Sequence, residues 1–514
     1  MVEERMYACA DEARGRRTAL SWGFKARYGA GSLTDGLVGA GLGFFLLFYL
    51  TAVCGMSGTM AGMASMIALL IDAVADPAIG LASDRLTTRW GRRLPFMVFS
   101  IVPFACAFGA LFSMPENLTG GALFLYATTC LVVLRLSLSA FVLPFTAVGA
   151  EITDDYLERA SVVSFRLTFQ YLGVLCGVML GLGVFLAGSN GLLLRRNYVP
   201  FAWTCALIIF AAGTVAIGAV RQGHARLHAP QAALTPFLAG LKQEVRELSG
   251  SRSFLFLFAT LIAYFLAYSA NVSLALYASR YFWKFDNFAI QLILISSSFG
   301  PLLGAPISAI ALRYFEKRSL EIACMLIIAV FLIWPPLLQI YGPIHLSAGV
   351  ATAVLIANGV FYGTALMVGG VAFQSMMADA ADEHELLFGV RREGLFFSGL
   401  TLAYKAASGL GGLIAGVALD AIGFPTHLVA EGATSAIPPG VIVKLGLISG
   451  PLPAILVAIA PAFLLGYRLT RKRQEEILAA LEKRRKPLGQ NSQDASFAAR
   501  ELEQLENVEA AIPR

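Results

Sequence analysis

Two aspartates, Asp72 and Asp76, lie one helical turn apart in the middle of a hydrophobic segment that is long enough to cross a bilayer. A charge at that depth costs several kcal/mol, so such a residue normally faces a protein cavity and serves an ion or a proton. A spacing of four places both side chains on one helix face, within reach of a single cation. Two adjacent carboxylates in a low-dielectric setting repel each other, so they bind either a proton or a hard cation. The pair therefore predicts that the chain couples movement of a solute across a membrane to a cation.

A lysine, Lys405, lies about 10 residues into another apolar segment, roughly 15 Å along a helix, which brings it near the same plane. One interpretation is a salt bridge that merely holds two helices together. Such a lock needs only one acid, whereas two acids against one lysine leave a net negative site. We therefore predict a coupling site in which cation occupancy releases or reorients Lys405.

Long apolar segments position these residues and make up most of the chain. Of the 514 residues, 57% are hydrophobic and only 14% are charged, against about 25% charged in a soluble protein. Stretches of about 20 residues or more predict twelve spans, near 28–53, 57–83, 94–114, 121–149, 161–187, 198–219, 253–279, 287–312, 319–341, 346–377, 395–422 and 441–468. All twelve must be helices, because lipid cannot satisfy an open backbone.

The distribution of Lys and Arg predicts the orientation. With both termini in the cytoplasm, 31 of the 39 basic residues fall on the cytoplasmic side. The longest inner loop, 220–252, separates two sets of six spans, 28–219 and 253–468, which lie between an N-terminal tail (1–27) and a charged C-terminal tail (469–514). Transporters built from two such bundles bind their substrate at the bundle interface near the midplane. The fold class that we predict is an all-α membrane protein with both tails in the cytoplasm.

Two inner loops carry charges that we predict to act in gating. In the first, charge-assisted bonds between helices would break and re-form as the bundles rock; its residues are Asp84, Arg85, Arg92 and Arg93. The simpler interpretation of this loop is positive-inside topology, to which Asp84 adds nothing. The second loop joins spans ten and eleven and contains Asp379, Asp382, Arg391 and Arg392. Ion pairs there would close the inner side, although surface pairs are individually weak.

Three segments carry a family resemblance. They are DAVADPAIGLASDRLTTRWGRR from Asp72 to Arg93, the loop DEHELLFGVRREGLFFS, and the lysine segment TLAYKAASGLGG. In this order they resemble the glycoside–pentoside–hexuronide:cation symporters, the melibiose-permease branch of the major facilitator superfamily. The resemblance covers essentially the whole chain and implies two pseudo-symmetric six-helix bundles of the major facilitator fold, alternating access, and solute uptake with Na⁺ or H⁺. Animal lysophospholipid transporters share this architecture and the paired acids.

The resemblance also implies roles for single residues. Asp72 and Asp76 match the two cation-site acids of the family, and Lys405 matches the lysine of that region. The matches that would contact substrate are Arg166 in SFRLTF, Thr401 one turn before Lys405, and Asp35, whose spacing differs by about one residue.

The sequence departs from the family pattern at positions that would bind the cation and at positions that would bind the sugar. Ala75 stands where the melibiose-type pattern has Asn, a neutral oxygen ligand for Na⁺, and this favours H⁺. Ser139 matches a hydroxyl ligand and can still coordinate a cation. Val142 and Thr146 replace the sugar-binding aspartate and the tryptophan that stacks on the sugar. Losing both counts against galactoside binding.

Arg135 lies near the middle of span four, an expensive position for a charge. It would pair structurally with Asp35, extend toward the interface, or serve the substrate or a gate. Together with Arg166 it would favour an anionic substrate such as a hexuronide.

Tyr268 and Asn271 lie three residues apart in span seven and are further candidates for hydrogen bonds to substrate. Buried bonds between helices are the commoner explanation for such residues.

The remaining sequence features argue against an enzyme. The chain shows neither a nucleotide-binding glycine loop nor a His/Cys metal spacing, and its five histidines lie in loops or at helix ends. We predict no cofactor beyond the coupling ion, H⁺ or Na⁺, and no nucleic-acid partner. The leading hypothesis is a monomeric symporter of a sugar or glycoside, with hexuronides and other acidic glycosides included, at a bacterial-type inner membrane. The alternatives are a transporter of an amphipathic solute such as a lysophospholipid, and a non-transporting receptor.

Overall fold

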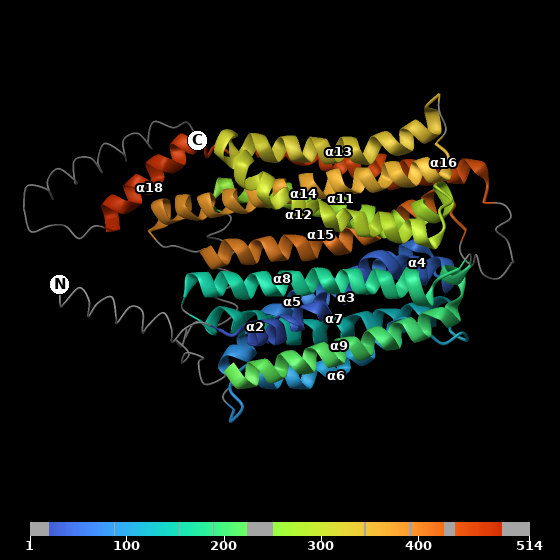
Figure 1. Cartoon of the computed structure of the whole chain (residues 1–514), viewed down its shortest axis with the longest axis horizontal. Helices are drawn as coiled ribbons and strands as arrows, with labels where there is room; N and C mark the ends of the chain where they lie inside the picture. The colour runs from blue at the N-terminus through green and yellow to red at the C-terminus, as the bar shows by residue number, and fades with distance from the viewer. Residues whose placement is uncertain are drawn as a thin grey trace, which may run out of the picture.

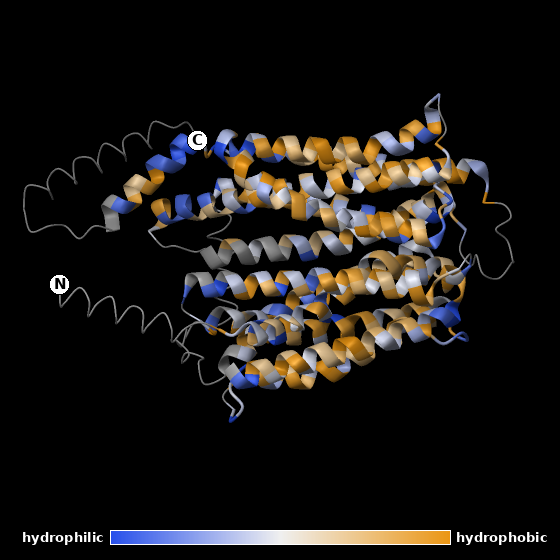
Figure 2. Ribbon diagram, in the orientation of Figure 1, coloured by the Kyte–Doolittle hydropathy of each residue, from blue (hydrophilic) through white to orange (hydrophobic). Residues whose placement is uncertain are grey.

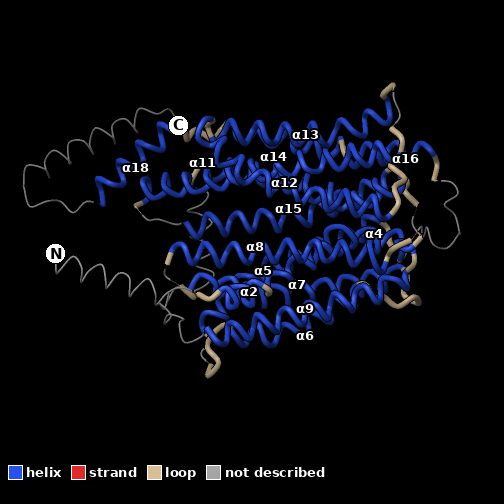
Figure 3. Tube along the Cα trace, viewed as in Figure 1, coloured by secondary structure: helices blue, strands red, loops and turns tan. Residues whose placement is uncertain are grey.

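The computed structural model describes residues 20–86, 88–153, 155–188, 190–223, 250–343, 346–389, 393–425 and 437–485. Within these ranges the secondary structure is helical and contains no strand (Figure 3). Eleven helical segments of the described chain are long and apolar enough to cross a membrane, and α15 (Glu393–Ala421) occupies the remaining predicted span. The prediction of an all-α membrane protein with twelve spans is confirmed.

In the first half of the chain, five short helical pieces stack end to end into the first span. They are α2 (Trp22–Gly29), α3 (Gly31–Ala40), η1 (Gly41–Phe45), α4 (Leu46–Phe48) and η2 (Tyr49–Val53). The next helices are α5 (Gly58–Arg85), α6 (Leu94–Leu111), α7 (Gly120–Glu151), α8 (Tyr156–Val178) with its continuation η3 (Met179–Phe185), η4 (Gly191–Leu193) and α9 (Arg195–Gly223).

The second half begins with α11 (Arg252–Tyr277), which η6 (Ala278–Phe282) continues. It goes on with α12 (Asn287–Tyr314), α13 (Lys317–Tyr341), α14 (Ala348–Phe388), α15, the pair α16 (Pro439–Ser449) and α17 (Pro451–Leu464), and α18 (Arg471–Arg485).

Two helices extend furthest past the predicted spans. α2 begins at Trp22, although the first span is predicted from 28, and α14 ends at Phe388, although the tenth is predicted to end at 377. The segment before Phe388 is rich in Ala, Glu and Leu, which favour a helix, and it contains neither Gly nor Pro. The helix stops at Gly389, whose φ of 75° is a left-handed conformation that suits glycine. Asp379 and Asp382 therefore lie on a helix and not in the predicted loop.

The helices of each half pack mainly against one another. The principal pairs are α3–α8, α6–α7, α5–α7 and α6–α9 in the first half, and α12–α14, α11–α15, α13–α14 and α11–α17 in the second (Figure 1). The main contact between the halves is α5 with α15. Apolar residues run along the helices, and hydrophilic residues concentrate toward the two ends (Figure 2). This distribution suits a bundle whose long axis crosses a membrane.

One end of the molecule, which we call the α18 end, carries the C-terminal helix α18. Ile477 and Leu481 of α18 are buried, and Gln474 Nε2 donates to Asp382 Oδ2 of α14 at 2.9 Å. This part of the predicted tail thus packs on the second half of the chain.

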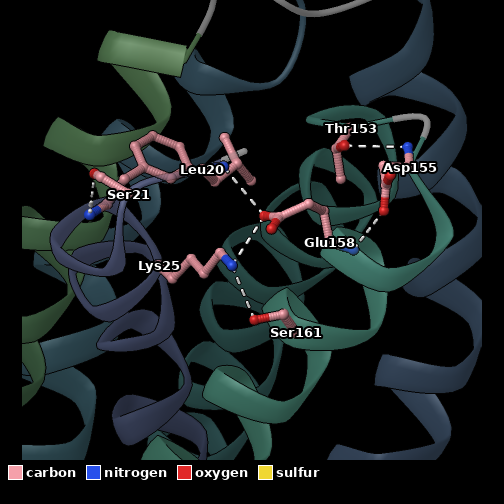
Figure 4. A network of polar contacts seen from close by, with 8 residues as sticks. Leu20, Ser21, Lys25, Thr153, Asp155, Glu158 and Ser161 are labelled. Atoms are coloured by element: carbon pink, nitrogen blue, oxygen red, sulfur yellow. Dashed lines mark hydrogen bonds and ion pairs between the residues drawn. The ribbon is translucent and has the colours of Figure 1, made fainter. Parts of the chain in front are cut away.

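The start of the first span is tied to α8 through a buried lysine (Figure 4). Lys25 is 5% exposed, its Nζ lies 2.9 Å from Glu158 Oε2, and it donates to Ser161 Oγ at 3.0 Å. The backbone N–H of Leu20 donates to the same Glu158 oxygen at 3.1 Å. Asp155 caps the first turn of α8 by accepting from the Glu158 N–H at 2.8 Å.

We expect this ion pair to make stability depend on pH on the acid side. The hydrogen bond from Lys25 holds the pKa of the Glu158 carboxyl below its ordinary value of 4.5. The resulting stability is fully present above the ordinary pKa, and it is lost as the pH falls through the lowered pKa of the folded protein. Glu158→Gln should therefore cost about 1 kcal/mol at neutral pH and flatten the acid-side fall of Tm for the purified protein in detergent. An unchanged acid-side profile in the variant would contradict this assignment.

Candidate cation and solute site

The four predicted cation-site residues meet where α5, α7 and α15 pack together. α5 carries Asp72 and Asp76, α7 carries Ser139, and α15 carries Lys405. Lys405 Nζ lies 2.8 Å from Asp72 Oδ2 and also donates to Asp76 Oδ2. The Ser139 hydroxyl donates to Asp72 Oδ1 at 2.6 Å, and Lys405 Nζ lies 3.5 Å from Ser139 Oγ. The structure thus brings all four side chains into one cluster, which we call the acid pair site.

The acid pair site lacks one positive charge. The side chain of Asp72 is 1% exposed, and those of Asp76 and Lys405 are 16% and 18% exposed. One ammonium group faces two carboxylates in this buried setting. Asp76 Oδ1 is buried and makes no hydrogen bond in the described structure. Because a buried uncompensated charge is costly, this oxygen is the atom at which a proton or cation would be bound.

Next to this site, a cavity of about 130 Å³ lies between α3, α7 and α8. Its lining includes Asp35, Phe145, Arg166 and Gln170. Gln170 Nε2 donates to Asp35 Oδ2 at 2.5 Å. Arg166 stacks over the Phe145 ring at 5.3 Å, while its buried Nε has no hydrogen-bond partner in the described structure. The cavity therefore offers a guanidinium group whose donors are not used by the part of the chain that the structure describes.

A second guanidinium group belongs to the same region. Arg135 of α7 lies within electrostatic reach of Asp35, as do Arg166 and Lys405. Neither hydrogen bond nor ion pair links Arg135 to another residue of the described chain. The partner of Asp35 is Gln170, so the structural pair of Arg135 with Asp35, one of its predicted alternatives, is not formed here.

Tyr268 and Asn271 line a different, larger cavity of about 330 Å³, to which both halves contribute. Asn271 Nδ2 donates to the backbone oxygen of Ser449 at 3.1 Å, which is the interhelical bond that the alternative interpretation expects. Tyr171 of α8 lines this cavity, one residue after Gln170 in the smaller one. The two cavities thus lie along one side of α8.

The predicted gating charges that the structure describes pair inside their own half of the chain. Arg92 and Arg93 lie 2.5 and 2.8 Å from Glu151 Oε1 of α7. Asp379 of α14 pairs with Lys317 of α13 at 2.6 Å, and Asp382 accepts from Gln474. In this conformation these contacts stabilise each half, and a gating role stays a prediction. The side chains of Asp84, Arg85 and Thr401, and the whole of Arg391 and Arg392, lie outside the described structure.

The two halves are joined at the end opposite α18. Asp420 of α15 accepts from the backbone N–H groups of Gly58 and Thr59, at 2.8 and 2.7 Å, and from the Thr59 hydroxyl at 2.6 Å. A carboxylate at the N-terminus of α5 also complements the helix dipole. We call this contact, which includes the close approach of Gly58 to Gly416, the α5–α15 seam.

Other bonds close the same end. Tyr277 of α11 bonds to Thr51 and donates to the backbone oxygen of Leu47 at 3.1 Å. Asn287 at the start of α12 donates to the backbone oxygens of Leu186 and Gly188, at 2.5 and 3.0 Å. The structure is therefore a conformation closed at the end opposite α18.

Sequence reasoning missed Gln170, Glu151 and Asp420. Gln170 lies four residues after Arg166, so helical spacing was a usable signal for it. Glu151 ends α7 close to the predicted arginine cluster, but only the packing of α6 on α7 brings them together. For Asp420 the sequence holds no signal, because its partners lie more than 360 residues away.

The fold and the site define a membrane transporter built from two sets of helices, with buried charges where the sets meet. Residues 27–471 match the family model described as MFS/sugar transport protein, and the chain belongs to this family. It is therefore a multi-pass membrane transporter and not an enzyme. The predicted family resemblance and class of function are confirmed.

Individual relatives are similar at moderate identity. The chain is 25% identical to the glucuronide carrier protein homolog of Escherichia coli (strain K12), with 91% of this chain and 97% of that protein covered. It is 22% identical to the isoprimeverose transporter of Lactiplantibacillus pentosus, with 82% and 84% covered. Among solved structures, a D-xylose-proton symporter superposes with a TM-score of 0.59 at 12% identity, covering 87% of this chain and 97% of that one. The last comparison shows likeness of fold alone.

Proposed function

We propose that this transporter is a symporter that takes up an acidic glycoside of the hexuronide class together with a proton. In this proposal the acid pair site binds the coupling ion. The cavity lined by Asp35 and Arg166 binds the carboxylate of the solute, with Arg135 adding positive charge nearby. Relatives named as a glucuronide carrier homolog and an isoprimeverose transporter support a sugar-type solute.

The proposal rests on two neighbouring sites of opposite net charge: the acid pair site is negative, and the region around Asp35 is positive. Two acids face one lysine in the acid pair site. In the neighbouring region Arg166 lines the cavity with Asp35, and Arg135 lies within electrostatic reach of the same acid. With both sites empty the imbalances offset each other, and with both ligands bound each site is neutral. With a single ligand bound, a net charge remains inside the membrane, where it is costly. Reorientation is therefore favoured for the empty and the fully loaded protein, which is the condition for symport.

A proton fits the acid pair site better than Na⁺ does. A proton needs one oxygen atom, and Asp76 Oδ1 is buried without a hydrogen-bond partner. Na⁺ would need several oxygens, and Ala75 supplies none where the melibiose-type pattern has Asn. Protonation of Asp76 would also weaken its hold on Lys405, which lies within electrostatic reach of Asp35 in the solute cavity.

We propose that the protein lies in a bacterial-type inner membrane with the α18 end on the cytoplasmic side, because basic residues concentrate in the loops and tails at that end. The conformation described here is then closed toward the outside. Each charge cluster of the proposal is built within one chain, so we propose that the monomer is the transporting unit.

Removing either arginine should cut uptake of a uronide. Arg166→Gln and Arg135→Gln each delete a charged donor for which the described residues supply no acceptor, so we expect initial uptake of glucuronide to fall about 10- to 100-fold. The assay uses membrane vesicles with an imposed pH gradient or, separately, an imposed Na⁺ gradient. The matched control is Arg221→Gln, which removes an exposed arginine at the end of α9.

The same assay contains the outcomes that would contradict the proposal. Undiminished glucuronide uptake in both variants would remove the arginines from the solute site. If a lysophospholipid accumulates and neither substitution reduces its accumulation, an amphipathic solute would be favoured. Absence of accumulation for every sugar, uronide and lysolipid tested would favour a receptor.

A further inference from the structure

The second half of the chain contains a buried carboxyl group that the proposed transport site does not use. Glu321 lies on α13, five residues after Glu316 and one turn after Lys317. It is only 5% exposed, and its Oε2 atom makes no hydrogen bond in the described structure. An ionisable side chain inside a membrane-spanning helix is expensive and marks a functional site by default.

The neighbouring helix leaves room for this carboxyl group at a glycine. A Cβ atom added to Gly369 of α14 would lie 2.7 Å from Glu321 Oε2 and 3.1 Å from Cys324 Cβ. α14 thus approaches the carboxyl group through its backbone, and it presents no polar side chain to Oε2.

The charges around Glu321 do not compensate it. Lys317, on the same face one turn earlier, is bonded to Asp379 of α14 at 2.6 Å. Arg318 donates to the backbone oxygen of Leu465 at 3.4 Å. Cys324 of α13 and Tyr264 of α11 lie within electrostatic reach of Glu321. Other titratable groups on the helices packed against α13 include Tyr362, Asp382, Glu383, His384 and Glu385 of α14, exposed Arg313 and Tyr314 at the end of α12, and exposed Lys444 of α16, whereas α17 has none.

An ionised carboxylate with no cation and an unbonded oxygen is strongly disfavoured in a buried position, whereas the neutral acid loses only a hydrogen bond. We propose that Glu321 is a second proton-binding site of this transporter, separate from the acid pair site, and that it holds its proton in the conformation closed at the end opposite α18. It lies one turn from Lys317, whose side chain is partly exposed near the α18 end. A ligand that is bound in one conformation favours that conformation, so protons should favour the state described here.

The protonation state is tested by infrared spectroscopy of the purified protein in lipid vesicles at neutral pH. The wild-type spectrum minus that of Glu321→Gln should contain the carbonyl band of a protonated carboxylic acid. The control is Glu316→Gln, which removes an exposed carboxylate from the start of the same helix and should yield the carboxylate bands instead. A carboxylate band in the Glu321 difference spectrum would overturn the proposal.

The conformational consequence is tested with spin labels at cysteines replacing Trp90 and Phe315, two exposed residues of opposite halves at the α18 end. Raising the pH should shorten the wild-type distance, as Glu321 loses its proton and the α18 end closes. Glu321→Gln mimics the neutral acid, so it should keep the long distance at high pH. A variant that follows the wild-type pH dependence would overturn the proposal.

A second substitution distinguishes a proton-binding role of Glu321 from a role in folding alone. Gly369→Ala retains the acid but crowds Oε2, so the carbonyl band should shift or disappear while Glu321 is still present. An unchanged band would contradict the proposed location of the proton. None of these readouts depends on the solute, so the proposal and the symport function fail independently.

Discussion

Replacing both Asp72 and Asp76 by asparagine should abolish accumulation of the solute against its gradient. The amides keep the shape of the site but bind neither a proton nor a hard cation, so the accumulation ratio should fall to about one in vesicles with an imposed ion gradient. Lys405 would then lack both of its carboxylate partners, and breaking a buried ion pair costs about 3–5 kcal/mol. The triple variant that also carries Lys405→Ala should therefore recover thermal stability without recovering accumulation.

The matched control is Asp286→Asn, at the exposed start of α12, where asparagine caps a helix as well as aspartate does. This variant should accumulate solute like the wild type. Gradient-driven accumulation by the double variant would show that the acid pair does not couple transport to an ion.

Replacing Gly416 by alanine should prevent the transporter from adopting the conformation described here. A Cβ atom at Gly416 would overlap the backbone carbonyl of Gly58 across the α5–α15 seam. Because the Cβ atom is fixed directly to the backbone of α15 and the oxygen belongs to the backbone of α5, rotation of a side chain cannot relieve the overlap. Such overpacking costs about 1–3 kcal/mol. We expect uptake to fall about tenfold or more and the halves to separate at the end opposite α18.

Gly412, one turn earlier on α15, supplies the control, because a Cβ atom there meets nothing within 4 Å. Gly412→Ala should leave uptake unchanged and stabilise the helix slightly, since alanine favours a helix over glycine. Wild-type uptake by Gly416→Ala would mean that the close approach of the two helices is not needed for transport.

The sequence predicts the acid pair site well because simple geometry governs it. Helical spacing places Asp72 and Asp76 on one face, and counting residues along the eleventh span brings Lys405 to their depth. The contacts of Lys405 with both acids agree with this prediction. The spans are equally predictable, since hydropathy responds directly to the requirement that lipid imposes on the backbone.

Contacts that depend on which helix faces meet could not be predicted. The bond from Gln170 to Asp35 and the capping of α5 by Asp420 follow from packing between helices that are distant in sequence. Glu321 lies two residues after the predicted start of its span at 319, so hydropathy treats it as the polar end of a span. Its burial results from the approach of α14 at Gly369, which only the three-dimensional packing reveals.

The seam and the ion site lie on the same two helices. α5 carries Gly58 near one end and the acids near its middle, and α15 carries Gly416 and Lys405 in the same way. If the two helices move apart as rigid bodies at the glycines, we expect the distance between the ammonium and the carboxylates to increase as well. Release of an ion toward that side would then require the seam to open, and a closed seam would limit ion leakage.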